Sequence, residues 1–155
     1  MSTYARNTEV TSDKSRQEIE RTLERYGADE FAYMTKTGLA VVAFAMNGRS
    51  VRFQLPLPDR SSPDFTRTPT GKTASESAQR TKYEQAVRQK WRALALVIKA
   101  KLEAIESEIS TFEQEFGMTI VMPDGRTAIE HVQPWIESAY ASGNVSSLLA
   151  IESGP

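Results

Sequence analysis

The stretch LAVVAFAMNGRSVRFQL, residues 39–55, decides the fold. Its first half, Leu39–Met46, is apolar on both faces of an extended chain, which predicts the central strand of a sheet. Asn47-Gly48 follows, and this pair is a strong hairpin signal because both central turn residues need a positive φ. The second half, Arg49–Leu55, alternates apolar and polar residues, so one face of this strand is expected to lie on a core.

The sequence before this hairpin adds a strand and a helix. Phe31–Lys36 is a β-like run joined to the central strand by Thr37-Gly38, so the three runs predict an antiparallel meander. Ser12 is placed to cap a helix that continues to Tyr26. Residues 1–11 are polar and are expected to form a frayed terminus. The N-terminal half therefore predicts one helix followed by three strands.

After the sheet, residues 56–74 are rich in Pro, Ser and Thr and are predicted to be a flexible basic loop. Residues 75–116 lack Gly and Pro, and their apolar side chains recur every three or four positions. One helix of 42 residues would be about 63 Å long, whereas a domain of this size has a radius of gyration of about 15 Å. The long helix must therefore bend, break or project, and a projecting stripe would be an interface. The expected interface residues are Tyr83, Val87, Trp91, Leu94 and Ile98.

The C-terminal part predicts a small strand and helices. Met118–Met122 resembles a short strand and is followed by a turn at residues 123–126. Thr127 and Glu130 have the spacing of a capping box, which predicts a helix through Tyr140. One or two helical turns are expected at 145–151. The whole chain, 1–155, is thus predicted to be a single α+β domain.

Composition excludes several classes of function. The chain has no Cys and one His. This composition excludes disulfide scaffolds, zinc fingers, Cys nucleophiles and those Ser-His-Asp triads that need a second well-placed set of partners. No run approaches the roughly 20 apolar residues of a membrane-spanning helix, and the N-terminus lacks the apolar stretch of a secretory signal. A cytoplasmic location is the expectation, with no membrane partner.

The short motifs point to no enzyme. Gly71-Lys72-Thr73 lacks the earlier Gly and the strand of a phosphate-binding loop, and His131 lacks the ligands that a metal site needs. Pro-Asp pairs could begin a restriction-like nuclease motif, but no Lys has an acid two positions before it. We therefore expect no catalytic residues, no cofactor and no metal. A Mg²⁺ site made of carboxylates alone in the acidic C-terminal part stays open as a third hypothesis.

The net charge of −1 is an average over two unlike parts. Residues 1–102 hold 18 Lys/Arg and 11 Asp/Glu, whereas residues 103–155 hold one Arg and 9 acids. Within the first part, residues 49–101 contain 12 bases and four acids. Such a local field attracts phosphates or an acidic partner. The alternative is that the basic stretch packs beside the protein's own acidic C-terminal part.

Three bases of the predicted long helix, Arg88, Arg92 and Lys99, fall within about 40° of each other on a helical wheel. They could follow a phosphate backbone, although i,i+4 pairs such as Glu84 with Arg88 offer a purely structural explanation. The predicted nucleic-acid-binding residues are Arg52, Arg60, Arg67, Lys72, Arg80, Lys82, Arg88, Arg92 and Lys99. Trp91 and Trp135 are interpreted as core or interface anchors.

Two segments carry a resemblance to a known family. The stretch WRALALVIKAKLEAIE (91–106) and the later MPDGRT (122–127) resemble a family of small uncharacterised bacteriophage and prophage proteins, as do 2–5 and 51–60. The resemblance covers most of the chain but brings no catalytic motif. It implies a setting in phage DNA metabolism, or in interference with a host system, inside a bacterial cytoplasm.

Two hypotheses follow for function. The first is a non-enzymatic accessory protein that binds single- or double-stranded DNA through a basic surface without base-specific readout. The second is a protein–protein interaction module, or an inhibitor of a host defence enzyme, that acts through its long helix on an acidic host protein or pairs with a second copy. The order helix, three strands, helix also occurs in double-stranded RNA-binding domains and in single-strand annealing proteins, which is an analogy of fold alone.

Overall fold

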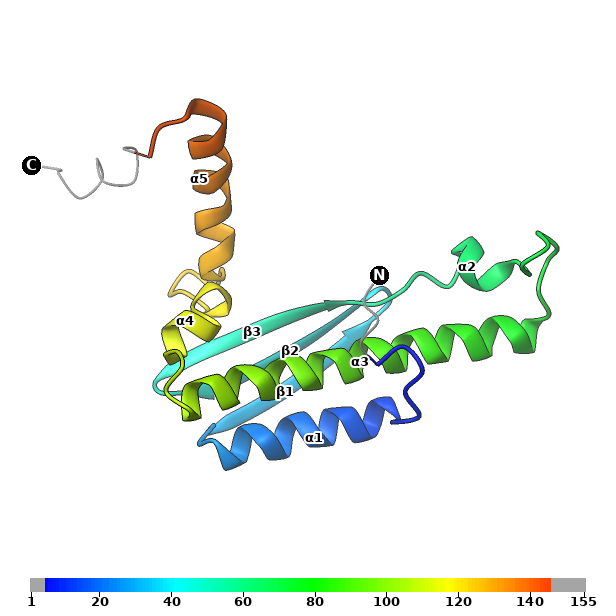
Figure 1. Cartoon of the computed structure of the whole chain (residues 1–155), viewed down its shortest axis with the longest axis horizontal. Helices are drawn as coiled ribbons and strands as arrows, with labels where there is room; N and C mark the ends of the chain where they lie inside the picture. Colours follow the sequence, from blue (N-terminus) through cyan, green and yellow to red (C-terminus); the bar gives the residue numbers. More distant parts are fainter. Residues whose placement is uncertain (1–4, 146–155) are drawn as a thin grey trace, which may run out of the picture.

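The computed structural model describes residues 5–145 and shows a three-stranded sheet with two long helices beside it (Figure 1). The elements are α1 (Ser12–Arg25), β1 (Glu30–Lys36), β2 (Leu39–Met46), β3 (Arg49–Pro56), α2 (Pro63–Thr66), α3 (Glu76–Glu106), α4 (Phe112–Phe116), the 3₁₀ turn η1 (Gly117–Thr119) and α5 (Ala128–Ser142). The predicted α+β class, with its meander and long helix, is confirmed.

The sheet has the order β1-β2-β3, and both neighbouring pairs are antiparallel. The Asn-Gly turn forms as predicted, with φ of 53° at Asn47 and 70° at Gly48. Along β2, side chains alternate between buried and half-buried positions, so the strand has one face on the core and one face that is partly open. The buried side chains are Ala40, Val42, Phe44 and Met46.

The core lies between this face of β2 and the two long helices, which cover the same side of the sheet (Figure 1). Ile19 and Leu23 of α1 and Ile98 and Leu102 of α3 are all buried there. Trp91 is also buried, and its ring makes an edge-to-face contact with Tyr33 of β1 at 6.2 Å between centroids. The opposite side of the sheet, which we call the outer face, has no such helix layer among the described residues.

The N-terminal segment is held against α3, whereas the sequence predicted a frayed terminus. The Gln85 side-chain amide donates hydrogen bonds to the backbone carbonyls of Arg6 and Thr8, at 3.3 and 3.0 Å. Helix α1 then begins one residue from the predicted cap, because the Thr11 side chain accepts from the backbone N–H of Lys14. Residues 1–4 lie outside the described part.

Of the three outcomes expected for the helical stretch 75–116, the structure shows a break, because α3 ends at Glu106. A loop with Glu108 at a φ of 58° follows, and a capping box of Thr111 and Gln114 starts α4. This break lets the chain turn, so that Phe116 packs on Phe44 of the sheet at 5.5 Å between ring centroids. A straight helix would have carried that aromatic side chain away from the core.

The predicted strand at Met118–Met122 is not formed in the described structure. The chain makes the 3₁₀ turn η1 and then touches the edge of β3 through an isolated bridge between Val51 and Ile120. The predicted capping box of Thr127 and Glu130 is confirmed, and α5 follows it. The expected turns at 145–151 fall almost wholly on residues outside the described part.

The segment 56–74 has more structure than the flexible loop that the sequence predicted. Ser62 caps the short helix α2, and Arg67 and Thr73 form an isolated bridge. Phe65 of α2 is buried and lies edge-to-face with Tyr83 of α3, at 5.7 Å between ring centroids. One aromatic contact therefore attaches this segment to the first turns of α3, which extend beyond the sheet (Figure 1).

We predict that Ile98→Ala lowers the free energy of unfolding by about 2–5 kcal/mol, because it leaves a cavity in the core. Its neighbour Val97 is the matched control, since it is 45% exposed whereas Ile98 is 0% exposed. Val97→Ala should change the free energy by less than about 0.5 kcal/mol. Denaturant unfolding followed by circular dichroism measures both, and equal losses would contradict this core.

Candidate nucleic-acid interface

The structure separates the nine predicted nucleic-acid-binding residues into three places. Arg88, Arg92 and Lys99 lie along the side of α3 that faces α1. Arg60, Arg67, Lys72, Arg80 and Lys82 lie on or beside the first turns of α3, in what we call the tip cluster. Arg52 lies apart from both groups.

Arg52 is on the outer face of the sheet. Its register partner on β2 is Ala43, which alternates away from the buried face. The guanidinium lies 3.6 Å from the carboxylate of Glu130, which belongs to the capping box at the start of α5. The pKa of Glu130 is held below its usual range, first by hydrogen bonds from the backbone and side chain of Thr127 and then by Arg52. Arg52 therefore contacts the first turn of α5.

The tip cluster is built around Tyr83. The Arg60 guanidinium lies over the Tyr83 ring at 4.4 Å from its centroid, and Arg80 lines the same hollow of about 250 Å³. Arg67 donates a hydrogen bond to the Thr73 hydroxyl at 3.2 Å. Glu76 also lines the hollow, so the cations here are partly balanced.

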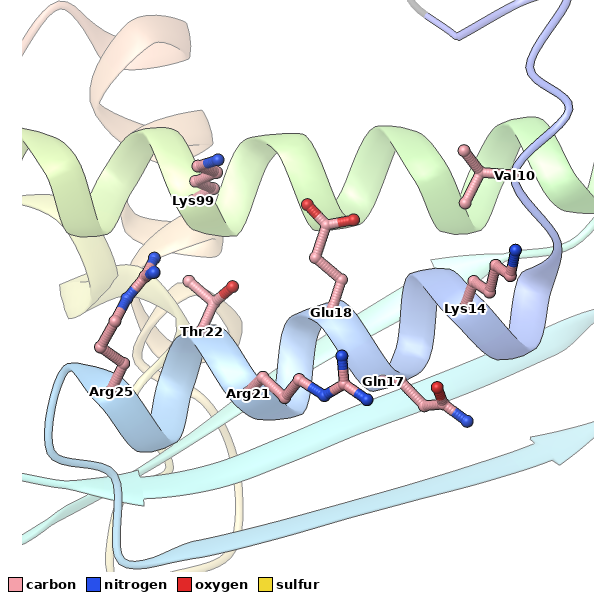
Figure 2. A pocket seen from close by; sticks show the side chains of 8 residues that line it. All are labelled: Val10, Lys14, Gln17, Glu18, Arg21, Thr22, Arg25 and Lys99. Atoms are coloured by element: carbon pink, nitrogen blue, oxygen red, sulfur yellow. The ribbon is translucent and has the colours of Figure 1, made fainter.

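Helices α1 and α3 run parallel and leave a groove between their exposed sides. Three cross-contacts show the direction: the Gln85 amide reaches Thr8, Arg92 pairs with Glu18, and the Tyr26 hydroxyl donates to the Glu103 carboxylate at 2.7 Å. The residue numbers of the contacting pairs increase together along the two helices, so α1 and α3 run in the same direction. Figure 2 shows the groove, which has a volume of about 620 Å³.

Charges on α1 are sorted by side. At 100° per residue, Lys14, Arg21 and Arg25 fall within about 40° of each other. These three line the groove together with Lys99 of α3 (Figure 2). The acids Asp13, Glu20 and Glu24 fall within another sector of about 40°, centred roughly 100° away. The basic row of α1 was not predicted, because the four bases of this helix are balanced by four acids and its composition shows no excess of charge.

The two basic rows have the same length. Lys14 to Arg25 and Arg88 to Lys99 each cover 12 residues, and their 11 steps of 1.5 Å make about 17 Å along a helix. One acid, Glu18, lines the groove and points from α1 toward α3, where it forms an ion pair with Arg92 (Figure 2). The charged side chains that line the groove are therefore Lys14, Arg21, Arg25 and Lys99 against the single acid Glu18, which is an excess of positive charge.

Tyr26 and Glu103 lie where α1 ends. The hydrogen bond to the Glu103 carboxylate, with desolvation, raises the pKa of the Tyr26 hydroxyl, so the phenol stays neutral. Because the bond joins the C-cap residue of α1 to α3, it fixes the spacing of the two helices at this end.

The acidic C-terminal part does not fill this groove in the described structure. Among residues 5–145, two ion pairs join bases of 49–101 to acids after residue 102, and these are Arg52 with Glu130 and Lys101 with Glu115. Both lie away from the groove, and α5 stands away from α1 and α3 (Figure 1). The described acids after residue 102 therefore leave Lys14, Arg21, Arg25 and Lys99 of the groove available.

Most side chains of the predicted interface stripe are buried in the core of the chain itself. Trp91, Leu94 and Ile98 are buried in the core formed with α1 and the sheet. Tyr83 and Val87 are half-buried: Tyr83 lies against Phe65 of α2, and Val87 packs against the edge of the core. A partner could reach only these two stripe residues without opening the fold.

The described residues show no group of three or more His, Cys, Asp or Glu side chains that could hold a metal ion. His131, the lone histidine, is exposed and lies 2.8 Å from the Asp124 carboxylate. Within residues 5–145, no helix is long and apolar enough to cross a membrane.

No protein-family model matches the chain, and the comparisons with curated proteins and with solved structures find no match either. The geometry of the groove is therefore the basis for inferring a function.

Proposed function

We propose that this chain is a non-enzymatic accessory protein that binds the phosphate backbone of nucleic acid in the groove between α1 and α3. The observation that carries the proposal is that Lys14, Arg21 and Arg25 of α1 and Lys99 of α3 line one groove together with a single acid, Glu18, which pairs with Arg92 of α3. The phage setting implied by the resemblance belongs to the same proposal.

The dimensions of the groove suit a sugar–phosphate chain. In a duplex, phosphates of one strand follow each other every 3.4 Å along the axis, so rows of about 17 Å would cover roughly five of them. Arginine and lysine are the side chains that contact phosphates most often, through charge-assisted hydrogen bonds. A second, weaker contact is expected at the tip cluster, which extends the basic surface along α3.

The proposed binding is not sequence-specific. No aromatic side chain lines the groove, so bases have no stacking platform there. The groove is bordered by two helices of the same chain, and neither stands free to enter a major groove of DNA. The contacts would therefore fall on phosphates, which are the same in every sequence.

Reversing the charge of two groove residues tests this proposal. We expect Arg21→Glu with Lys99→Glu to weaken binding to a fluorescent oligonucleotide by roughly 10- to 100-fold at low salt, as measured by anisotropy. The slope of log K against log salt should become shallower by about 1.8 for duplex DNA, since each lost phosphate contact accounts for about 0.9. The loss should be the same for unrelated sequences.

The control for this variant carries the same change of charge outside the groove. Arg49 and Lys90 are both exposed and neither lines the groove, so Arg49→Glu with Lys90→Glu should retain most of the affinity. Equal losses in the two variants would show attraction to overall charge. Absence of binding by the unaltered chain to single- or double-stranded DNA or RNA at low salt would overturn the proposal; capture of an acidic protein by the same groove would then favour the alternative function.

Removing the groove acid should have the opposite effect. We predict that Glu18→Gln tightens binding about 2- to 10-fold, because it frees Arg92 for at most one more phosphate contact. Glu20→Gln makes the same change of net charge on the other side of α1 and should have little effect. The same anisotropy titration compares the two, and an equal gain in both would contradict the placement of the site.

A further inference from the structure

The sheet has one open edge. Because the strand order is β1-β2-β3, only β1 and β3 lie at edges. The edge of β3 is partly covered, since Val51 bridges Ile120 and the backbone N–H of Val121 donates to the carbonyl of Ser50 at 2.7 Å. In the described part of the chain, no segment pairs with the outer edge of β1.

Strand β1 lacks most of the features that normally protect an edge, and its charged side chains, Glu30 and Lys36, stand only at its two ends. Its sequence, EFAYMTK, contains no Pro or Gly, and its seven-residue register with β2 runs without a bulge. Six of its seven residues are exposed, including Tyr33 at 51% and Met34 at 55%, and these two point to opposite faces. A regular edge that no other segment pairs with is a template for another strand.

We propose that a second copy of this chain pairs with β1, so that two β1 strands form an antiparallel ladder about a two-fold axis at Tyr33. In this register Glu30 of one copy lies opposite Lys36 of the other, at both ends of the ladder. Phe31 lies opposite Thr35 and Ala32 opposite Met34. The edge is thus complementary to itself in charge, which is the property that an isologous contact requires.

The direction of the peptide groups supports this register. The two-residue turn between Lys36 and Leu39 closes on a hydrogen-bonded pair, so alternate residues of β1 back to Glu30 direct their peptide groups to β2. The peptide groups of Phe31, Tyr33 and Thr35 then point to the open edge. The proposed ladder pairs these residues only with one another, so every outward group meets a partner.

The pairing also preserves the two faces of the sheet. Residues with even numbers on β1 lie on the outer face and pair only with even-numbered residues of the second copy. The product is a six-stranded sheet with α1 and α3 of both copies on one side. The proposal does not depend on nucleic-acid binding, and the two can fail separately.

A cysteine at the axis tests the pairing directly, because the natural chain has no cysteine. In Tyr33→Cys the two Cα atoms would lie about 5.5 Å apart, within the range that a disulfide spans. We expect mild oxidation to give a covalent dimer on non-reducing gels. Thr35→Cys is the matched control on the same face, since its two copies would be about 13 Å apart and should remain monomeric on the gel.

A covalent dimer with Tyr33→Cys and none with Thr35→Cys supports the proposal. Equal cross-linking of both, or of neither when circular dichroism shows folded protein, overturns it. Sedimentation of the unaltered chain should give twice the mass of the 155-residue chain, and a monomer up to high micromolar concentration also overturns it.

A charge swap provides a second test that leaves Tyr33 in place. Lys36→Glu should weaken the dimer about 2- to 30-fold in sedimentation experiments, because two like-charge pairs replace two opposite ones. Adding Glu30→Lys restores opposite charges in the same register and should restore the affinity. Failure of the double variant to recover would contradict the proposed register.

Discussion

The burial of Trp91 is the contact on which the rest of the structure depends. Its indole is 1% exposed and belongs to the same core cluster as Ile19 of α1 and Val42 of β2. The Arg16 guanidinium of α1 lies over this ring at 4.9 Å and over the Tyr33 ring at 5.0 Å. Because one side chain holds two helices to one face of the sheet, α1 and α3 must lie side by side. The groove and its two rows of cations follow from that constraint.

The sequence predicted the sheet well because its signals are local. The turn at Asn47-Gly48 and the alternation in β2 depend on residues close together in the chain. The end of α3 depends on tertiary packing, since the apolar period continues through Ile109 although that side chain is exposed in the structure. The aromatic contact between Phe116 and the sheet favours the break. The local signal for it in the sequence is the capping-box spacing of Thr111 and Gln114, which lies within the continuing apolar period.

The groove was half predictable for a related reason. On α3, Arg88, Arg92 and Lys99 stand out because bases outnumber acids in that segment. Helix α1 has four bases and four acids, so its net charge is zero and its composition shows nothing. The separation of these charges into two sides becomes visible only with the helical periodicity and with the knowledge of which side faces α3. The same separation explains how a chain of net charge −1 presents a basic surface.

The central claim is that the α1/α3 groove is where nucleic acid lies, and an NMR titration tests it most directly. A short single-stranded oligonucleotide would be added to ¹⁵N-labelled protein at low salt, and the changes in backbone amide shifts would be mapped onto the structure. This account predicts that the largest changes fall in residues 14–25 and 85–99, with smaller ones in the tip cluster. Changes centred on residues 60–82, or no changes at all, would contradict it.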